Sequence, residues 1–507
     1  MHIVVRTDAS LRIGVGHVVR CLTLGESLRE EGASVTFVCR SQAGDMCDAI
    51  ERRGFGLTRL PPMDDEVDGT FGREDAGLTL AAIRLLPERP AWIVVDHYLL
   101  GEDWERAVGV AVDRILVIDD LADRTHACDI LLDQNLVPRM RLRYGDRVPE
   151  TCTQLLGPSY ALLQPMYGSL HAGIPPRSGA VRRLFAFFSG ADTDNFTGQM
   201  IAAFIALGRV DITLDAVVTA SNPHAPALRD LVAGHDNIRL HSDLPTLASL
   251  MAEADLAVGA GGATSWERMC LGLPSLVITL ADNQRAVAQE MNERGLVRWL
   301  GHKDEVHQAE IFAALRDIIA DGLDEAWSLR CSRTVDGKGA LRVCAALTVT
   351  GDTTLRARLA TVDDEALLLE WANDATTRRN AFSQEQISVE NHRAWFHNRL
   401  RDLQNCRIYI VETAAGVPVG QARFDRDDAS LAVDYALAPQ FRGRGLGKPV
   451  LEAALGELKA AEPGAALVAH VKSGNVPSRR VFESLGFDVE ETPLGFAYRR
   501  VLTRRTP

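Results

Sequence analysis

The chain has 507 residues, of which 46% are hydrophobic and 24% are charged. This length exceeds what one hydrophobic core serves, so we expect roughly two to four globular domains. The formal net charge of −13 argues against general binding to nucleic acid or to anionic membranes, and no apolar run approaches the length of a membrane span. The nine cysteines are scattered without metal-binding spacing, which favours a reduced, cytoplasmic location without a signal peptide, and no metal is expected.

A glycine-containing loop follows the first predicted strand at residues 3–5, and apolar spacing then predicts a helix from about residue 16 to 31. Gly14 and Gly16 allow the backbone to approach a ligand closely, and the helix N-terminus offers free N–H groups to an anion. His17 stands at this helix start and can exchange a proton near neutral pH. From spacing alone, His17 fits a catalytic residue and a helix-capping residue equally well.

Strand and helix patterns alternate through residues 1–172, the first predicted domain. Strands are predicted at 35–39, 91–96 and 114–120, a helix at 46–53, and an acidic loop at 61–75. This alternation predicts a parallel sheet with helices on both faces, which binds ligands at the carboxyl ends of its strands. Asp96 and Tyr98 follow one of these strands directly. They fit ligand-orienting residues or capping residues of the loop.

A second alternating unit, residues 180–347, follows a glycine- and proline-rich linker at 173–179. Strands are predicted at 184–188, 256–258 and 274–279, and a helix at 265–271. The glycine-rich run 259–262 opens that helix, so its backbone amides can cradle a diphosphate. Glu267, in the first turn, can accept hydrogen bonds from both ribose hydroxyls, or can compensate the helix dipole.

Two sets of motifs in these lobes carry a family resemblance. Arg6, Asp8, Gly14, Gly16, His17 and Arg20 resemble the first loop of the nucleotide-sugar hydrolases of pseudaminic acid synthesis. The loop is more distantly similar to that of the GT-B transferase that makes lipid II. Residues 261–267, 272–274 and 281–284 resemble the UDP-binding segment of GT-B enzymes, and residues 189–192 resemble their phosphate-side loop.

The resemblance implies that UDP binds to the second lobe while the sugar faces the first. His17 then activates or positions a water that attacks the anomeric carbon, and Asp96, Tyr98 and Asn283 orient the water and the sugar. The resemblance assigns substrate or UDP contacts to Arg6, Asp8, Gly14, Gly16, Ser189, Gly190, Gly261, Gly262, Ala263, Thr264, Glu267 and Gln284.

Residues 353–503 carry a different pattern, with strands predicted at 355–358, 407–412, 419–425 and 430–437 and helices at 365–373 and 390–401. Residues 440–447 match Q/R-x-x-G-x-G/A, and residues 474–487 supply a second motif. Both resemble the GNAT acetyltransferases. The resemblance implies that acetyl-CoA is a co-substrate and contacts Leu437, Arg442, Gly443, Arg444, Gly445, Gly447, Asn475, Ser478 and Phe482.

One position departs from the GNAT pattern. Phe482 stands where many members carry the tyrosine that reprotonates the CoA thiolate. Tyr498 or a water could substitute, or the thiolate could leave unaided. Asp434, Tyr435 and His392 are candidates for the base that takes the amine proton.

The sequence therefore predicts an α/β chain: a GT-B-like pair of Rossmann-like lobes followed by an α+β GNAT acetyltransferase domain. The resemblance implies two steps of pseudaminic acid synthesis. The C-terminal part acetylates the 4-amino group of a UDP-linked amino sugar, and the N-terminal part hydrolyses UDP-2,4-diacetamido-2,4,6-trideoxy-β-L-altropyranose. Contacts with other enzymes of nonulosonic acid synthesis fit this role. Two alternatives stay open: a GT-B glycosyltransferase with an acceptor other than water, and a hydrolase whose acetyl-CoA-binding module is regulatory.

Overall fold

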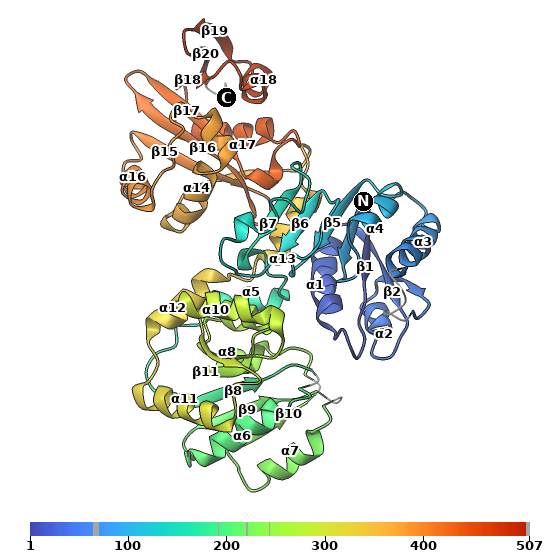
Figure 1. Cartoon of the computed structure of the whole chain (residues 1–507). Coiled ribbons are helices and arrows are strands. Elements are labelled where there is room, and N and C mark those ends of the chain that lie inside the picture. Colours follow the sequence, from blue (N-terminus) through green and yellow to red (C-terminus); the bar gives the residue numbers. More distant parts are fainter. Residues whose placement is uncertain (64–69, 191, 220–221, 243, 503–507) are drawn as a thin grey trace. The chain divides into compact units, whose positions relative to one another are not determined.

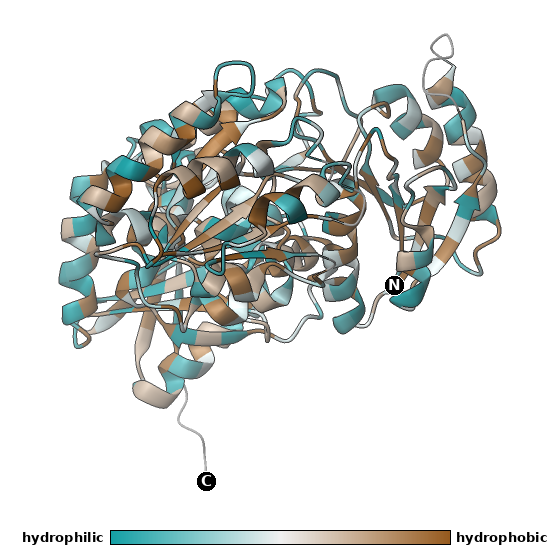
Figure 2. Cartoon of the chain, turned by 90° about the horizontal axis from the view of Figure 1, so that it is seen from below, coloured by the Kyte–Doolittle hydropathy of each residue, from teal (hydrophilic) through white to brown (hydrophobic). Residues whose placement is uncertain are grey.

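The computed structural model describes residues 1–63, 70–190, 192–219, 222–242 and 244–502 (Figure 1). The chain forms two compact units, Met1–Cys344 and Ala345–Pro507. Within the described residues, no helix combines the length and the apolar content that a membrane crossing requires. In Figure 2 the helices carry both teal and brown residues, as expected for helices that bury one face against a sheet.

The first lobe of the N-terminal unit is a parallel sheet of seven described strands. Their spatial order is β3 (Gly56–Leu60), β2 (Ser34–Arg40), β1 (His2–Thr7), β4 (Trp92–Asp96), β5 (Arg114–Ile118), β6 (Ile130–Asp133) and β7 (Thr153–Leu156). The central strands β1 and β4 are buried along their whole length, as is typical of a sheet covered on both faces. The connecting helices are α1 (Gly16–Glu30), α2 (Cys47–Arg52), α3 (Phe71–Arg84) and α4 (Glu102–Gly109).

The second lobe is a parallel sheet of six described strands. Their order is β10 (Ile238–His241), β9 (Thr213–Val217), β8 (Arg183–Phe187), β11 (Leu256–Ala260), β12 (Ser275–Thr279) and β13 (Arg298–His302). Its helices are α5 (Pro165–His171), α6 (Phe196–Ala206), α7 (Ala225–Val232), α8 (Ala248–Glu253), α9 (Thr264–Cys270), α10 (Arg285–Glu293), α11 (Gln308–Asp321) and α12 (Glu325–Thr334).

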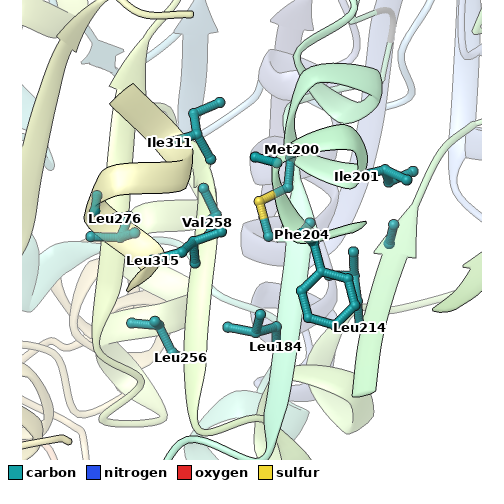
Figure 3. Packing of buried hydrophobic residues seen from close by; sticks show 14 of the residues in the cluster. Leu184, Met200, Ile201, Phe204, Leu214, Leu256, Val258, Leu276, Ile311 and Leu315 are labelled. Atoms are coloured by element: carbon teal, nitrogen blue, oxygen red, sulfur yellow. The ribbon is translucent and has the colours of Figure 1, made fainter. Parts of the chain in front are cut away.

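The core of the second lobe lies between this sheet and helices α6 and α11 (Figure 3). Met200 and Phe204 on α6 and Leu315 on α11 pack over Leu184 and Val258 of the sheet, and all five side chains are almost completely buried. Burial of this apolar surface is the main force that holds the helices on the strands. The packed sheet thereby fixes the strand ends from which the glycine-rich loops leave.

Two segments cross between the lobes and touch at glycines. Gly168 and Gly337 approach so closely that a Cβ built on Gly337 would lie 2.5 Å from Gly168 Cα. A Cβ on Gly339, the first residue of α13 (Gly339–Thr348), would collide with the carbonyl oxygen of Ala161. Arg342 on α13 also donates to the Ser159 carbonyl oxygen at 2.8 Å. Residues 337 and 339 therefore have no room for a side chain where the two connecting segments touch.

The C-terminal unit contains a mixed sheet of seven described strands. Their order is β14 (Arg356–Leu359), β15 (Cys406–Glu412), β16 (Pro418–Asp427), β17 (Ser430–Leu437), β18 (Ala466–Val471), β20 (Gly495–Val501) and β19 (Asp488–Thr492). The β17–β18 pair is parallel and the other pairs are antiparallel. The helices of this unit are α14 (Glu365–Ala372), α15 (Ala375–Asn380), α16 (Val389–Arg401), α17 (Gly447–Ala461) and α18 (Val476–Ser484).

The predicted fold class is confirmed: two Rossmann-like lobes with parallel sheets precede an α+β domain. The acidic loop predicted at 61–75 is wrong in its second half, because α3 begins at Phe71. Residues 64–69 of that prediction lie outside the described residues. Phe71, Ala76 and Ile83 bury the inner face of α3, and intervening polar residues hide this helical spacing in the sequence.

Candidate active sites

The carboxyl ends of β1 and β4 bring the predicted hydrolytic residues of the first lobe together. Thr7 and Asp96 are register partners at the ends of these two strands. The loop after β1 is closed by a hydrogen bond from the Gly14 N–H to the Ser10 carbonyl oxygen (2.8 Å). Gly14 has a φ of +81°, which glycine adopts without strain. The loop places His17 in the first turn of α1, beside Asp96.

Asp96 is fully buried at the centre of this group. Its carboxylate accepts hydrogen bonds from Arg20 Nε and Nη2, both at 2.6 Å, and from His17 Nδ1 at 2.5 Å. Burial alone would raise the pKa of Asp96, but Arg20 and His17 lower it well below its ordinary value. Since the ionised carboxylate accepts the hydrogen on Nδ1, the Nε2 atom of a neutral His17 keeps a lone pair that can take a proton.

Tyr98 completes this group. Its ring meets the His17 ring edge to face, with 4.6 Å between the ring centroids. Burial and the charge of Asp120 raise the pKa of Tyr98 above its ordinary value, so its hydroxyl stays protonated at neutral pH. Arg20 also donates to Asp120 at 3.1 Å. Arg20 thus links Asp96 to Asp120. It belongs to the loop motif but was not among the predicted catalytic residues.

Arg6 and Asp8, which were predicted to contact the substrate, are buried in an ion-pair network under the loop. Arg6 donates to Asp8 (2.7 Å) and to Asp75 on α3 (2.5 Å). Asp75 also pairs with Arg40 and accepts from Trp104 Nε1 at 2.9 Å. These contacts satisfy Arg6 within the protein, so we infer that it supports the loop. Direct contact of Arg6 or Asp8 with a ligand stays a prediction.

In the second lobe, β11 ends in the glycine-rich loop that precedes α9. A Cβ on Gly259 would collide with the Phe187 carbonyl oxygen and the Arg268 guanidinium, so this position has no room for a side chain. Arg268 is buried beneath the loop and donates to the Ala260 carbonyl oxygen at 2.8 Å. The guanidinium thereby fixes the path of the chain into Gly261, Gly262, Ala263 and Thr264.

Glu267 lines a cavity of about 350 Å³ in the second lobe, together with Tyr167 and Thr246. One carboxylate oxygen of Glu267, Oε2, is buried without a hydrogen-bond partner among the described residues. Burial raises the pKa of Glu267 to about 7, although the Tyr167 hydroxyl and the Arg268 charge oppose this shift. A ligand that donates hydrogen bonds here would satisfy the carboxylate. Tyr167, on α5, was not predicted as a site residue.

The other predicted residues of this lobe lie in two turns. Ser189 has a φ of +109°, an uncommon conformation for a residue with a side chain and one that often marks a functional turn. The carbonyl oxygen of Gly190 accepts a hydrogen bond from the Thr219 hydroxyl, while Ala191 lies outside the described residues.

The second turn contains Asn283 and Gln284. The Gln284 side chain accepts a hydrogen bond from the Leu280 N–H at 2.9 Å, and Asn283 is exposed.

The glycine motif of the C-terminal unit forms the turn before α17. Gly443 and Gly445 have φ values of +73° and +76°, and open space surrounds the position of a Cβ at both. Their role is therefore conformational, as expected for a loop that presents successive amides to a phosphate. Arg442 pairs with Asp374 at 2.5 Å, and Arg444 donates to the Ala346 carbonyl oxygen at 2.5 Å. Gly447 begins α17.

Strands β17 and β18 separate next to this loop. Their backbones pair only over Ser430–Ala432 and Ala466–Val468, whereas β18 continues to pair with β20. Beyond the last pair, both strands line a cavity of about 920 Å³. The predicted acetyl-CoA residues on its wall are Leu437, Arg442, Gly443, Asn475, Ser478 and Phe482. Residues of α14, α15 and α16 also line this cavity.

Phe482 is buried among aromatic rings, 5.3 Å from the Tyr498 ring and 5.7 Å from the Tyr435 ring. Tyr498 is fully buried, and its hydroxyl donates to Glu483 at 3.0 Å. Tyr435 is one of the residues that line the cavity, and its hydroxyl donates to Ser478 at 3.2 Å. Of these two tyrosines, Tyr435 is therefore the better placed to meet a ligand.

The structure thus combines a GT-B-like pair of Rossmann-like lobes with a C-terminal domain of the acetyltransferase type. Residues 354–488 match the family model described as an acetyltransferase (GNAT) domain. The UDP-2,4-diacetamido-2,4,6-trideoxy-β-L-altropyranose hydrolase of Campylobacter jejuni is 25% identical over 60% of this chain and 97% of its own length. The chain thus resembles a fusion of such a hydrolase with a GNAT domain.

Two further comparisons cover more of the chain. The protein MJ1062 of Methanocaldococcus jannaschii is 21% identical over 96% of both chains. The crystal structure of MurG from Acinetobacter baumannii, at 11% identity, covers 68% of this chain and 99% of its own with a TM-score of 0.47.

Proposed function

We propose that the chain is a bifunctional enzyme of pseudaminic acid synthesis. Its C-terminal domain would transfer an acetyl group from acetyl-CoA to the 4-amino group of a UDP-linked amino sugar. Its N-terminal lobes would then hydrolyse the product, UDP-2,4-diacetamido-2,4,6-trideoxy-β-L-altropyranose. The order is chemically consistent, because the product of the acetyl transfer is the substrate of the hydrolysis.

The observation that carries the hydrolytic step is the buried His17–Asp96–Arg20 arrangement. We propose that water attacks the anomeric carbon while the bond from this carbon to the UDP oxygen breaks, through an oxocarbenium-like state. The water proton passes to His17 Nε2, and Asp96 stabilises the imidazolium that forms. Tyr98, and Asn283 from the second lobe, are proposed to orient the water and the sugar.

The UDP is proposed to bind in the second lobe. The unpartnered Oε2 of Glu267 supports a role in accepting hydrogen bonds from the ribose hydroxyls. Backbone amides at Gly261–Thr264 and at Ser189–Gly190 are proposed to bind the diphosphate, since the close packing at Gly259 holds the first of these loops in place. UDP is a good leaving group once its charge is stabilised by such donors.

Coupling of the two reactions tests this proposal. The full chain is incubated with the UDP-linked 4-amino sugar, with and without acetyl-CoA, and free CoA and UDP are both measured. We expect CoA release and UDP release together when acetyl-CoA is present, and little UDP release without it. UDP release that does not depend on acetyl-CoA, or no release at all, contradicts the coupled function.

The two alternatives give different results in the same assay. A glycosyltransferase would release UDP only after a sugar or lipid acceptor is added. A regulatory acetyl-CoA module would bind acetyl-CoA in calorimetry without producing free CoA. Supplying the UDP-diacetamido sugar directly then isolates hydrolysis from acetyl transfer.

The pH dependence of UDP binding tests the role of Glu267. Ribose hydroxyls donate to an ionised carboxylate, so UDP selects the ionised form of a group whose pKa is about 7. UDP affinity should therefore rise about tenfold between pH 6 and pH 8, as the ionised fraction rises. Titration calorimetry of Glu267→Gln, in which only the phosphates of UDP still titrate, is the matched control. An unchanged pH dependence in this variant contradicts the assignment.

A further inference from the structure

A histidine on the wall of the cavity in the C-terminal unit has one ring nitrogen for which the described residues provide no hydrogen-bond partner. His392, on α16, is 2% exposed and lines the cavity of about 920 Å³. Its Nδ1 is buried and lacks a partner among the described residues. The ring packs at 5.6 Å from the Trp395 ring and stacks at 5.7 Å on Phe396. Buried polar atoms are normally hydrogen-bonded, so this nitrogen calls for an explanation.

The other two candidates for a base in this cavity have partners. Asp434 has a half-exposed side chain and pairs with Arg423 at 3.3 Å. The Tyr435 hydroxyl donates to Ser478, and burial raises the pKa of Tyr435 above its ordinary value, which keeps it protonated. Of the three, His392 alone combines burial at the cavity wall with an unpartnered nitrogen.

Burial favours the neutral form of the His392 ring. Burial lowers its pKa below the ordinary value, and the nearby charge of Glu365 on α14 opposes this shift. A neutral imidazole has one nitrogen with a free lone pair. The charged and titratable groups that share the cavity lining are Arg378 on α15, Arg423 on β16, Asp434 and Tyr435 on β17, Arg442 in the glycine loop, and His470 and Lys472 on β18 and the turn after it.

We propose that His392 is the base of the acetyl transfer and takes the proton of the acceptor amine; this rests on the proposed acetyltransferase function. The amine nitrogen attacks the thioester carbonyl carbon, and a carbon–nitrogen bond forms while the carbon–sulfur bond breaks. The electron pair of that bond leaves on the CoA sulfur. The amine proton passes to the imidazole of His392 and from there to the thiolate or to water, so that amide and CoA thiol are the products.

The test compares His392→Gln with His397→Gln in the full chain. His397 lies on the same helix, but its Nε2 is hydrogen-bonded to Glu365 at 2.8 Å. Acetylation of the UDP-linked 4-amino sugar is followed by CoA release from pH 5.5 to 9. We expect kcat of His392→Gln to fall about 10²-fold, with KM for acetyl-CoA unchanged. The decrease in rate at low pH that follows protonation of His392 should disappear, whereas His397→Gln should behave as wild type.

The other possible results of this experiment separate a failure of the role of His392 from a failure of the proposed acetyltransferase function. Wild-type kcat and pH profile in His392→Gln overturn the role of His392, while the proposed acetyltransferase function stands. No CoA release by the wild-type chain overturns the proposed function and this inference with it. If His392→Gln fails to bind acetyl-CoA in calorimetry, the rate of CoA release by His392→Ala is measured with and without added imidazole. Recovery of rate supports the base role, and a rate that imidazole leaves unchanged overturns it.

Discussion

His17→Ala is expected to lower kcat for UDP release from the UDP-diacetamido sugar by about 10²- to 10⁴-fold. The reason is that the imidazole is held by Asp96 through Nδ1, at 2.5 Å, in the tautomer whose Nε2 accepts a proton. Alanine removes the proton acceptor and leaves the cavity beside Glu267 in the second lobe, the proposed UDP site, unchanged. UDP release is measured by a coupled assay at saturating substrate.

Two measurements separate this effect from misfolding. UDP affinity by calorimetry and acetyl-CoA-dependent CoA release should both stay near wild type in His17→Ala. Asp96→Asn provides the matched variant, because an amide can hold the ring in the opposite tautomer and should also lower kcat strongly. Hydrolysis that survives His17→Ala at the wild-type rate would show that the loop has another role.

Arg6→Met should lower the free energy of unfolding of the N-terminal unit by about 3–5 kcal/mol, because it leaves buried carboxylates without their cation. Arg6 is fully buried and bridges Asp8 and Asp75. Urea unfolding followed by far-UV circular dichroism measures this loss, and the transition that shifts in the variant is the one that belongs to the N-terminal unit. Arg106→Ala, which removes an exposed pair with Glu102, serves as the surface control and should cost less than about 1 kcal/mol.

The same pair of variants tests the predicted contact of Arg6 with the substrate. A small loss of stability combined with a large rise in KM would mean that Arg6 binds the ligand and that the buried network is secondary. A large loss of stability with KM unchanged in the folded fraction would assign Arg6 to the support of the loop.

Local sequence patterns were sufficient to predict most of the architecture. Apolar runs of five or so residues mark the buried parallel strands, and glycines mark the loops at their ends, so the alternation of β1–α1 and β11–α9 could be read directly. The start of α3 could not, because polar residues interrupt its inner face. The position of Asp96 at the ligand-binding edge followed from the general rule that ligand-binding residues gather at the carboxyl ends of parallel strands. Its place in one site with His17 was implied by the family resemblance.

The partners that tune these groups could not be predicted, because they are distant in the sequence. Asp75 meets Arg6 from 69 residues away, and Tyr167 meets Glu267 from a separate helix. No local spacing encodes such pairs. The free nitrogen of His392 is likewise a property of its surroundings, since the sequence around it indicates only a helix.

The paired glycine crossings between the two lobes have a mechanical consequence. The segment 173–179 is fixed to the second lobe by hydrogen bonds. Arg177 donates to the carbonyl oxygens of Ala254, Met251 and Ala252, and the backbones of Gly179 and Leu323 are hydrogen-bonded to each other. We therefore expect any rotation of one lobe against the other to occur about the contact between residues 159–168 and 336–342. Two connecting segments in contact resist twisting more than one segment does. We therefore expect the lobes to close about a single hinge axis that passes near Gly337 and Gly339.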